Sequence, residues 1–89
     1  MIIEGNKYIH FELWGDTGKT QLWRVINKSG CYQLGLITWF GSWRQYVFQP
    51  VENTEYNNTC LITITNFINH LNKEKRVALP VIRGEDNKE

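Results

Sequence analysis

The chain has few cysteines, little proline and no excess of charge of either sign. Its 89 residues include 2 Cys and 2 Pro, and 10 Lys and Arg stand against 9 Asp and Glu. Cys31 and Cys60 are too few for a disulfide scaffold and lack metal-ligand spacing, so we expect free, half-buried thiols. A formal net charge of +1 argues against a dedicated duplex-DNA binder, which normally has a clearly basic surface.

Long apolar runs are also missing. No stretch approaches the ~18 apolar residues of a membrane span, and the N-terminal residues have neither the basic nor the apolar part of a secretion signal. We therefore expect a cytoplasmic protein with no membrane partner. The length suits one domain with a modest core, and an aromatic fraction of 13% supplies large side chains to fill it. Residues 1–76 are the predicted domain, and residues 77–89 an apolar then charged C-terminal tail.

Turn residues divide the first fifty positions into four predicted strands. Polar and apolar side chains alternate through the first of them, which is typical of a half-buried strand. Gly41-Ser42 suits a two-residue type II′ turn, and Pro50 is expected to end the last strand. The predicted strands are residues 7–14, 20–27, 31–40 and 43–49.

A helix is predicted over residues 59–75, with Asn58 or Thr59 as its N-cap. A strand through 61–65 stays open as an alternative, because Thr and Ile alternate there. The fold class predicted is α+β: a four-stranded antiparallel β-meander with one C-terminal α-helix packed on one face. The apolar residues at helical spacing, expected to face the sheet, are Leu61, Ile64, Phe67, Ile68 and Leu71.

The turns also predict the strand register. We expect Phe40 to pair with Trp43, and Arg24 with both His10 and Gly35. Directly paired residues share a face, so the core face should hold Ile9, Phe11, Leu13, Trp23, Val25, Tyr32, Leu34, Leu36, Phe40, Trp43 and Val47. The second face should hold Tyr8, His10, Glu12, Leu22, Arg24, Ile26, Ile37, Trp39, Arg44, Tyr46 and Phe48. A slip of one residue would move a strand to the opposite face.

The second predicted face mixes arginine with large aromatic rings, and one helix leaves it uncovered. Arginine pairs with phosphate and stacks on rings, aromatic faces stack nucleobases, and Gly35 would let a ligand approach the sheet. A subunit interface is the other interpretation, because Trp, Tyr and Arg dominate interface hot spots. The candidate ligand- or partner-binding residues are Arg24, Trp39, Arg44, Tyr46, His10 and Tyr8.

The stretch from Leu34 to Pro50, LGLITWFGSWRQYVFQP, is followed after a short loop by CLITITNFINHLN. Together they resemble a family of small uncharacterised proteins of bacteriophages and bacterial genomes, in which an LGxIxWyxxWRxYxFxP hairpin precedes a short helix. The match covers roughly residues 20–72. The resemblance implies a β-meander plus helix and a phage context, and no established activity.

We therefore expect a small non-enzymatic phage-type binding protein that holds a nucleotide-like anionic ligand on its aromatic and arginine face, with a possible sequestering or anti-defence role. The alternative is a protein–protein interaction module, a homo-oligomer or an inhibitor of a host protein, that uses the same face. Single-stranded nucleic acid is the less favoured ligand at this net charge. No catalytic residue, metal site or cofactor is predicted, and a homo-oligomer in the host cytoplasm is expected.

Overall fold

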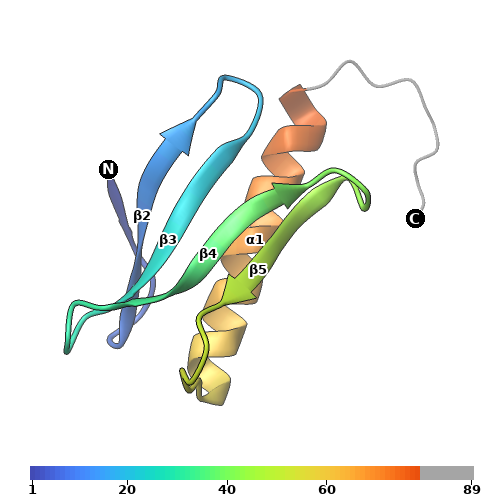
Figure 1. Cartoon of the computed structure of the whole chain (residues 1–89). Coiled ribbons are helices and arrows are strands. Elements are labelled where there is room, and N and C mark those ends of the chain that lie inside the picture. Colours follow the sequence, from blue (N-terminus) through green and yellow to red (C-terminus); the bar gives the residue numbers. More distant parts are fainter. Residues whose placement is uncertain (79–89) are drawn as a thin grey trace.

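The computed structural model describes residues 1–78 of the chain. These residues form an antiparallel sheet of five strands in chain order, followed by one helix. Figure 1 shows the helix behind one face of the twisted sheet, with the other face open toward the viewer. The elements are β1 (Ile2–Glu4), β2 (Ile9–Asp16), β3 (Gln21–Asn27), β4 (Gln33–Phe40), β5 (Gln45–Pro50) and α1 (Asn58–Ala78).

The α+β class and the meander order are confirmed, and the number of strands was wrong. β1 is only three residues long, too short for its side chains to show an alternating pattern. It pairs antiparallel with β2, with Ile3 opposite Phe11. The sheet therefore gains one narrow edge strand that sequence periodicity could not reveal.

The predicted helix is confirmed and the alternative strand over 61–65 was wrong. The helix begins one residue earlier than expected, because the Asn57 side-chain Oδ1 accepts a hydrogen bond from the Cys60 N–H at 2.8 Å. Asn57, rather than Asn58 or Thr59, is thus the N-cap. The helix continues to Ala78, so residues 77 and 78 belong to it. The rest of the predicted C-terminal tail, residues 79–89, lies outside the described residues.

The last hairpin has a longer turn than predicted. Trp39 pairs with Tyr46 and Phe40 with Gln45, so a four-residue turn replaces the expected two-residue Gly41-Ser42 loop. Arg44 closes this turn in the left-handed region, at φ 55°, and its N–H bonds the Gly41 carbonyl at 3.2 Å. The predicted pair Phe40–Trp43 was wrong by two residues, because Phe40 pairs with Gln45. A shift of two residues leaves the side chains of β4 and β5 on the same faces relative to each other.

The first hairpin is also shifted by two residues. His10 pairs with Ile26, and Arg24 pairs with Glu12 instead of with His10. Side chains alternate between the two faces with a period of two residues, so a shift of two residues leaves each side chain on its predicted face. This holds across β2 and β3 up to Leu13. The first error that reverses a face therefore lies between β3 and β4.

A β-bulge at Leu34 reverses the faces of β4 and β5. Ile26 pairs with Gln33, but Val25 pairs with Gly35, so Leu34 is an extra residue in β4. One inserted residue turns every later side chain to the opposite side of the sheet. Arg24 consequently faces Leu36 instead of Gly35. Four residues that were predicted for the second face lie instead on the side of the sheet that faces α1. These residues are Ile37, Trp39, Tyr46 and Phe48.

The bulge is held by hydrogen bonds and close packing. The Leu34 carbonyl accepts bonds from the Val51 N–H at 2.8 Å and the Tyr56 hydroxyl at 2.6 Å. A Cβ on Gly35 would lie 2.6 Å from the Gln49 carbonyl oxygen and 2.7 Å from the Phe48 ring. The space that we predicted for a ligand at Gly35 is thus occupied by Phe48.

The core lies between the sheet and α1. Phe67 of the helix stacks on Phe11, with ring centroids 4.1 Å apart, and meets the Trp23 ring edge-on. Ile64, Phe67 and Leu71 are buried as expected, whereas Leu61 is 46% exposed and Cys60 takes the buried position. Both cysteines are free, Cys31 being exposed. The predicted core positions that the structure leaves exposed or only half-buried are Leu13, Tyr32, Leu36, Phe40, Trp43 and Val47.

One buried side chain fastens the helix to the edge of the sheet. The Asn72 Oδ1 accepts a hydrogen bond from the backbone N–H of Tyr46 at 2.8 Å, and Asn72 is 8% exposed. A buried N–H without a partner costs free energy comparable to a lost hydrogen bond. Within residues 1–78, no helix is both long and apolar enough to cross a membrane.

The β2–β3 turn is organised by a carboxylate. The Asp16 Oδ1 accepts a bond from the Gly18 N–H at 2.8 Å, and its Oδ2 accepts one from the Gln21 side chain at 3.2 Å. Gly18 has a φ of 88°, which favours glycine. The Gly18 bond and, secondarily, the Gln21 bond lower the pKa of Asp16 below its ordinary value.

Replacing Asn72 is expected to weaken the fold. Asn72→Ala leaves the buried Tyr46 N–H without its acceptor, which should lower the free energy of unfolding by about 1–3 kcal/mol. The control is Asn58→Ala, an exposed asparagine of the same helix, which should change stability by less than about 0.5 kcal/mol. Urea unfolding followed by tryptophan fluorescence measures both; equal effects in the two variants would contradict the role given to Asn72.

The Asp16 turn predicts a pH-dependent contribution to stability. A carboxyl whose pKa is lower in the folded state stabilises the fold above its unfolded pKa of about 3.9, and this contribution is lost as pH falls through the folded pKa. Wild type should therefore melt at a higher temperature than Asp16→Asn at neutral pH, and the two melting temperatures should converge in acid. A difference that is constant with pH would contradict this assignment.

Candidate ligand-binding site

The face of the sheet opposite α1 carries an ordered cluster around Arg24. Its Nη1 donates to the Glu12 Oε1 at 3.1 Å, and its Nε donates to the Gln33 Oε1 at 3.0 Å. The Trp14 ring lies 4.8 Å from the guanidinium carbon. Arg24 thus uses at least two of its five N–H donors and one face of its guanidinium within the protein. We call this side of the sheet the open face; its members on β2–β5 include His10, Glu12, Arg24, Ile26, Gln33, Leu36, Thr38, Val47 and Gln49.

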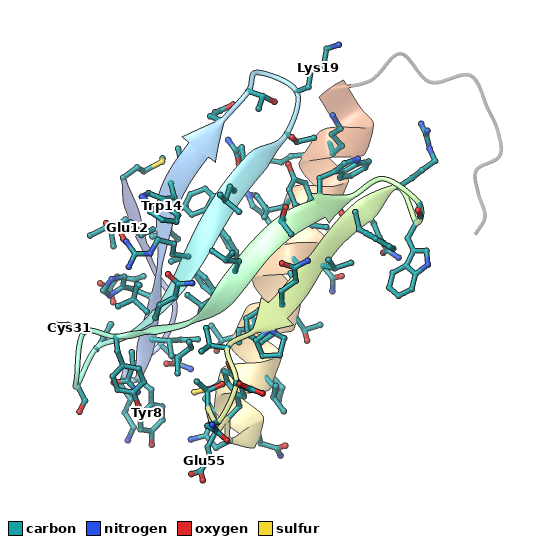
Figure 2. All side chains as sticks on the ribbon, viewed as in Figure 1. Tyr8, Glu12, Trp14, Lys19, Cys31 and Glu55 are labelled. Carbon is teal, nitrogen blue, oxygen red and sulfur yellow. The ribbon has the colours of Figure 1, made fainter. Side chains whose placement is uncertain are left out.

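Trp14 owes its position to a second bulge. Leu13 pairs with Trp23 and Gly15 with Leu22, which leaves Trp14 as an extra residue in β2. Bulges re-aim side chains, and here the indole turns over Arg24 while 62% of the residue remains exposed. Figure 2 shows Trp14 beside Glu12 on β2. An exposed, rigid aromatic next to an arginine is suited to stacking against a planar ligand.

The β4–β5 turn presents a second exposed indole. Trp43 is 66% exposed and meets the ring of Phe40 edge-on, with centroids 4.9 Å apart. Arg44 follows it and is exposed. We call Phe40, Trp43 and Arg44 the aromatic turn. Its arginine belongs to no ion pair within residues 1–78, so its guanidinium is available to an anion.

On the side of the sheet that faces α1, the side chains next to the aromatic turn are packed against one another. Trp39 meets Tyr46 edge-on at 5.3 Å, and the Lys75 ammonium lies 5.2 Å from the Trp39 ring centroid. Lys75 also donates to the Lys19 carbonyl, which ties α1 to the β2–β3 turn. Tyr46 is 5% exposed, and its hydroxyl accepts a bond from the Gln21 N–H at 3.0 Å. Tyr46 is therefore a core residue, with both its ring and its hydroxyl engaged.

The remaining two candidate residues lie away from the aromatic turn. Tyr8 precedes β2, is 41% exposed and packs its ring under the Lys7 ammonium at 5.2 Å; Figure 2 places it at the opposite end of the sheet from Trp14. His10 is half-buried on the open face, opposite Ile26 and Glu4. Glu4 is paired with Lys28, which lowers the pKa of its carboxyl.

The structure thus divides the six predicted site residues into separate groups. Arg24 and His10 lie on the open face, Trp39 and Tyr46 on the helix side, Arg44 in the turn and Tyr8 at the far end. They do not form one platform. Within residues 1–78, no three His, Cys, Asp or Glu side chains are grouped as metal ligands would be.

Two exposed tryptophans were missed from the predicted site. Trp14 follows Leu13 directly, so two large apolar residues are adjacent in a strand, and one of them must face the solvent unless both sides are covered. That adjacency was the available signal. Trp43 was placed on the core face because the turn was taken as two residues, and nothing in the local sequence revealed the longer turn.

Comparison with known proteins gives one informative relationship. The chain is 36% identical over 77 residues to a protein of Acholeplasma phage L2 described as "Uncharacterized 9.3 kDa protein", an alignment that covers 85% of this chain and 99% of that protein. No protein-family model and no solved structure matches. At this identity over nearly the whole relative, the chain belongs to the same family as the uncharacterized 9.3 kDa protein of Acholeplasma phage L2.

Proposed function

We propose that this is a small non-enzymatic phage-type protein that binds a nucleotide-like anionic ligand, with the aromatic turn as its principal contact. Trp43 supplies a ring on which a nucleobase stacks, and Arg44 supplies a cation for the phosphate. The proposed setting is the host cytoplasm, where such binding would sequester a signal or defence nucleotide.

The observation that supports this proposal most directly is the exposure of Trp43 next to Arg44. A tryptophan that is 66% exposed gives up much of the stabilisation that burial of its ring would supply. Its ring is held edge-on by Phe40, so its free face is pre-oriented. Arg44 adopts a left-handed φ of 55°, in which an arginine is strained relative to glycine. An exposed ring next to an arginine whose backbone is strained is typical of a binding site.

Trp14 and Arg24 form a second stacking point on the open face. Trp14 is held by the Arg24 guanidinium, and Arg24 is held in turn by Glu12. This chain of contacts immobilises the indole, which reduces the entropy lost when a ligand binds. We infer that a larger ligand, such as a dinucleotide or a short single strand, would reach this second ring.

We also infer that the LGxIxWyxxWRxYxFxP hairpin is characteristic of the family. Most of its positions have a structural task in this chain: Gly35 packs against Phe48 and Trp39 against Tyr46. Trp43 and Arg44 are different, because both are exposed. They are the positions of the pattern most suited to a shared binding role.

A protein partner on the same surface is the second function that a specific observation favours. Tryptophan and arginine are the residue types most enriched at interface hot spots, and both Trp14 and Trp43 are more than half exposed. This second function includes inhibition of a host protein. A protein partner needs no phosphate group, whereas the nucleotide-like ligand of the first proposal has one. A panel of nucleotides therefore separates the two.

The first test measures the melting temperature against mono-, di- and cyclic nucleotides, short single-stranded oligonucleotides and inorganic phosphate. A ligand that binds only the folded state stabilises it by about 2.7 kcal/mol at a hundred times its dissociation constant. We expect a shift with at least one nucleotide. Trp43→Ala should weaken its binding by about 1–3 kcal/mol, the usual contribution of one stacked base.

Arg44→Gly provides the matched test of the cation. Glycine relieves the left-handed backbone, so the variant should fold at least as well as wild type while losing the nucleotide-dependent shift. The control is Asn53→Gly, a change at another residue with positive φ, 63°, which should leave the shift intact. A flat panel for wild type, or a shift retained in both Arg44→Gly and Trp43→Ala, would refute the ligand proposal.

A further inference from the structure

The charged side chains that the structure describes are distributed unevenly between the two ends of the sheet, although the whole chain has a formal net charge of only +1. The β2–β3 turn, the β4–β5 turn and the C-terminal end of α1 lie together at one end (Figure 1). Figure 2 shows Lys19 at this end and Glu55 at the opposite one. The exposed or half-buried cations of the first end, which we call the basic end, are Lys19, Arg44, Lys73 and Lys75.

Carboxylates do little to neutralise the basic end. The Asp16 carboxylate accepts two hydrogen bonds within its own turn, and the Glu74 carboxylate lies 3.2 Å from the His70 ring nitrogen. At the opposite end, which holds the β1–β2 and β3–β4 turns and the loop before α1, carboxylates outnumber cations, and Lys28 is paired with Glu4. The charged residues of that end are Glu4, Lys7, Lys28, Glu52 and Glu55.

Lys75 joins the end of α1 to both turns. Its ammonium donates to the Lys19 carbonyl in the β2–β3 turn and lies 5.2 Å from the centroid of the Trp39 ring. Trp39 pairs with Tyr46 on either side of the β4–β5 turn. Lys75 is half-buried by these contacts, so it holds the two turns beside the helix.

A second contact brings two exposed cations to the same place. The Asn72 Oδ1 accepts a hydrogen bond from the Tyr46 N–H at 2.8 Å. Arg44 lies two residues before Tyr46 in the chain, and it is exposed. Lys73 directly follows Asn72 and is also exposed. An arginine of the β4–β5 turn and a lysine of α1 therefore flank one hydrogen bond.

The stability of the helix does not account for these cations. Favourable contacts with the helix dipole are confined to the last turn, and Lys73 lies more than one turn before the end of α1 at Ala78. Lys19 and Arg44 are outside the helix. Within residues 1–78, none of the three belongs to an ion pair. Like charges that folding brings together repel one another, and a bound polyanion would relieve that repulsion.

We propose that the basic end and the aromatic turn together bind single-stranded nucleic acid. This inference rests on the function proposed for the aromatic turn and narrows its ligand to a strand with several phosphates. The phosphates contact Lys19, Arg44 and Lys73, and a base stacks on Trp43. Strands β3 and β5, which begin after the two turns, are two strand spacings or about 10 Å apart. Successive phosphates of one strand span that distance, whereas a single phosphate group does not.

The exposed indole selects a single strand over a duplex. Trp43 is 66% exposed, and its ring requires an unpaired, unstacked base as its partner. The net charge of +1 made single-stranded nucleic acid the less favoured ligand in the sequence, but that value averages a basic end with an acidic one. The charge that faces the strand is the charge of the basic end.

The test is fluorescence anisotropy of a labelled short oligo(dT) over a range of salt concentrations. For single strands, the slope of log K against log salt is about −0.7 for each phosphate that the protein neutralises. Lys19→Gln and Lys73→Gln should each weaken binding several-fold at low salt and reduce the size of the slope by about 0.7. Lys75 is left unchanged because it also holds the two turns.

The matched control is Lys7→Gln, which removes the same charge from an exposed position at the opposite end. It should leave both the affinity and the slope at their wild-type values. The same oligo(dT) annealed to oligo(dA) should bind more weakly than the single strand, because its bases are already paired. Melting temperatures show that each variant remains folded.

Three results would each overturn this inference: no binding of oligo(dT), tighter binding of the duplex, or losses in Lys19→Gln and Lys73→Gln no larger than the loss in Lys7→Gln. A mononucleotide that still raised the melting temperature through Trp43 and Arg44 would then leave the aromatic turn as a nucleotide site. The failure of this inference is therefore distinguishable from the failure of the proposed function.

Discussion

The placement of every side chain on β4 and β5 depends on one extra residue. Because Leu34 is inserted between the residues paired to Ile26 and Val25, the side chains of the later residues change face. Ile37, Trp39, Tyr46 and Phe48 therefore lie on the side of the sheet that faces the helix. The bulge persists because its carbonyl has two donors, one of them the Tyr56 hydroxyl in the loop before α1. The loop that leads into α1 therefore stabilises the bulge in β4. The helix that follows this loop covers the side chains that the bulge turns toward it.

Much of the architecture was predictable because it depends on the spacing of apolar residues and on the position of turn-forming residues. Alternation in residues 9–13 and helical spacing from Ile64 to Leu71 each correspond to a real element, and the Gly and Asp residues around position 16 mark a real turn. β1 was not predictable, since three residues carry no period. The bulges at Trp14 and Leu34 were not predictable either, because each is stabilised by contacts with residues distant in the chain, Arg24 and Tyr56 respectively.

The candidate site shows the same limit more sharply. Arg44 was recognisable as a candidate from sequence, whereas Trp43 was assigned to the core face. The platform assigned to Arg24, Trp39, Arg44 and Tyr46 depended on a register that changes at one residue. A site that spans several strands inherits every register error between them. A site within one turn depends only on the geometry of that turn, which is why the aromatic turn is a candidate and the larger platform is not.

The bond from Tyr46 to Asn72 also protects the protein against self-association of its strands. β5 is an edge strand, and edges with unpaired N–H and C=O groups recruit other chains. On its outer side the Tyr46 N–H is occupied by the helix, and Pro50 has no N–H to offer. If α1 detached, this edge would become accessible next to an apolar hairpin, the sequence signature of aggregation-prone strands. The docked helix therefore removes one backbone donor from this edge, and we expect edge-to-edge pairing of β5 to be easier in any state in which α1 is displaced.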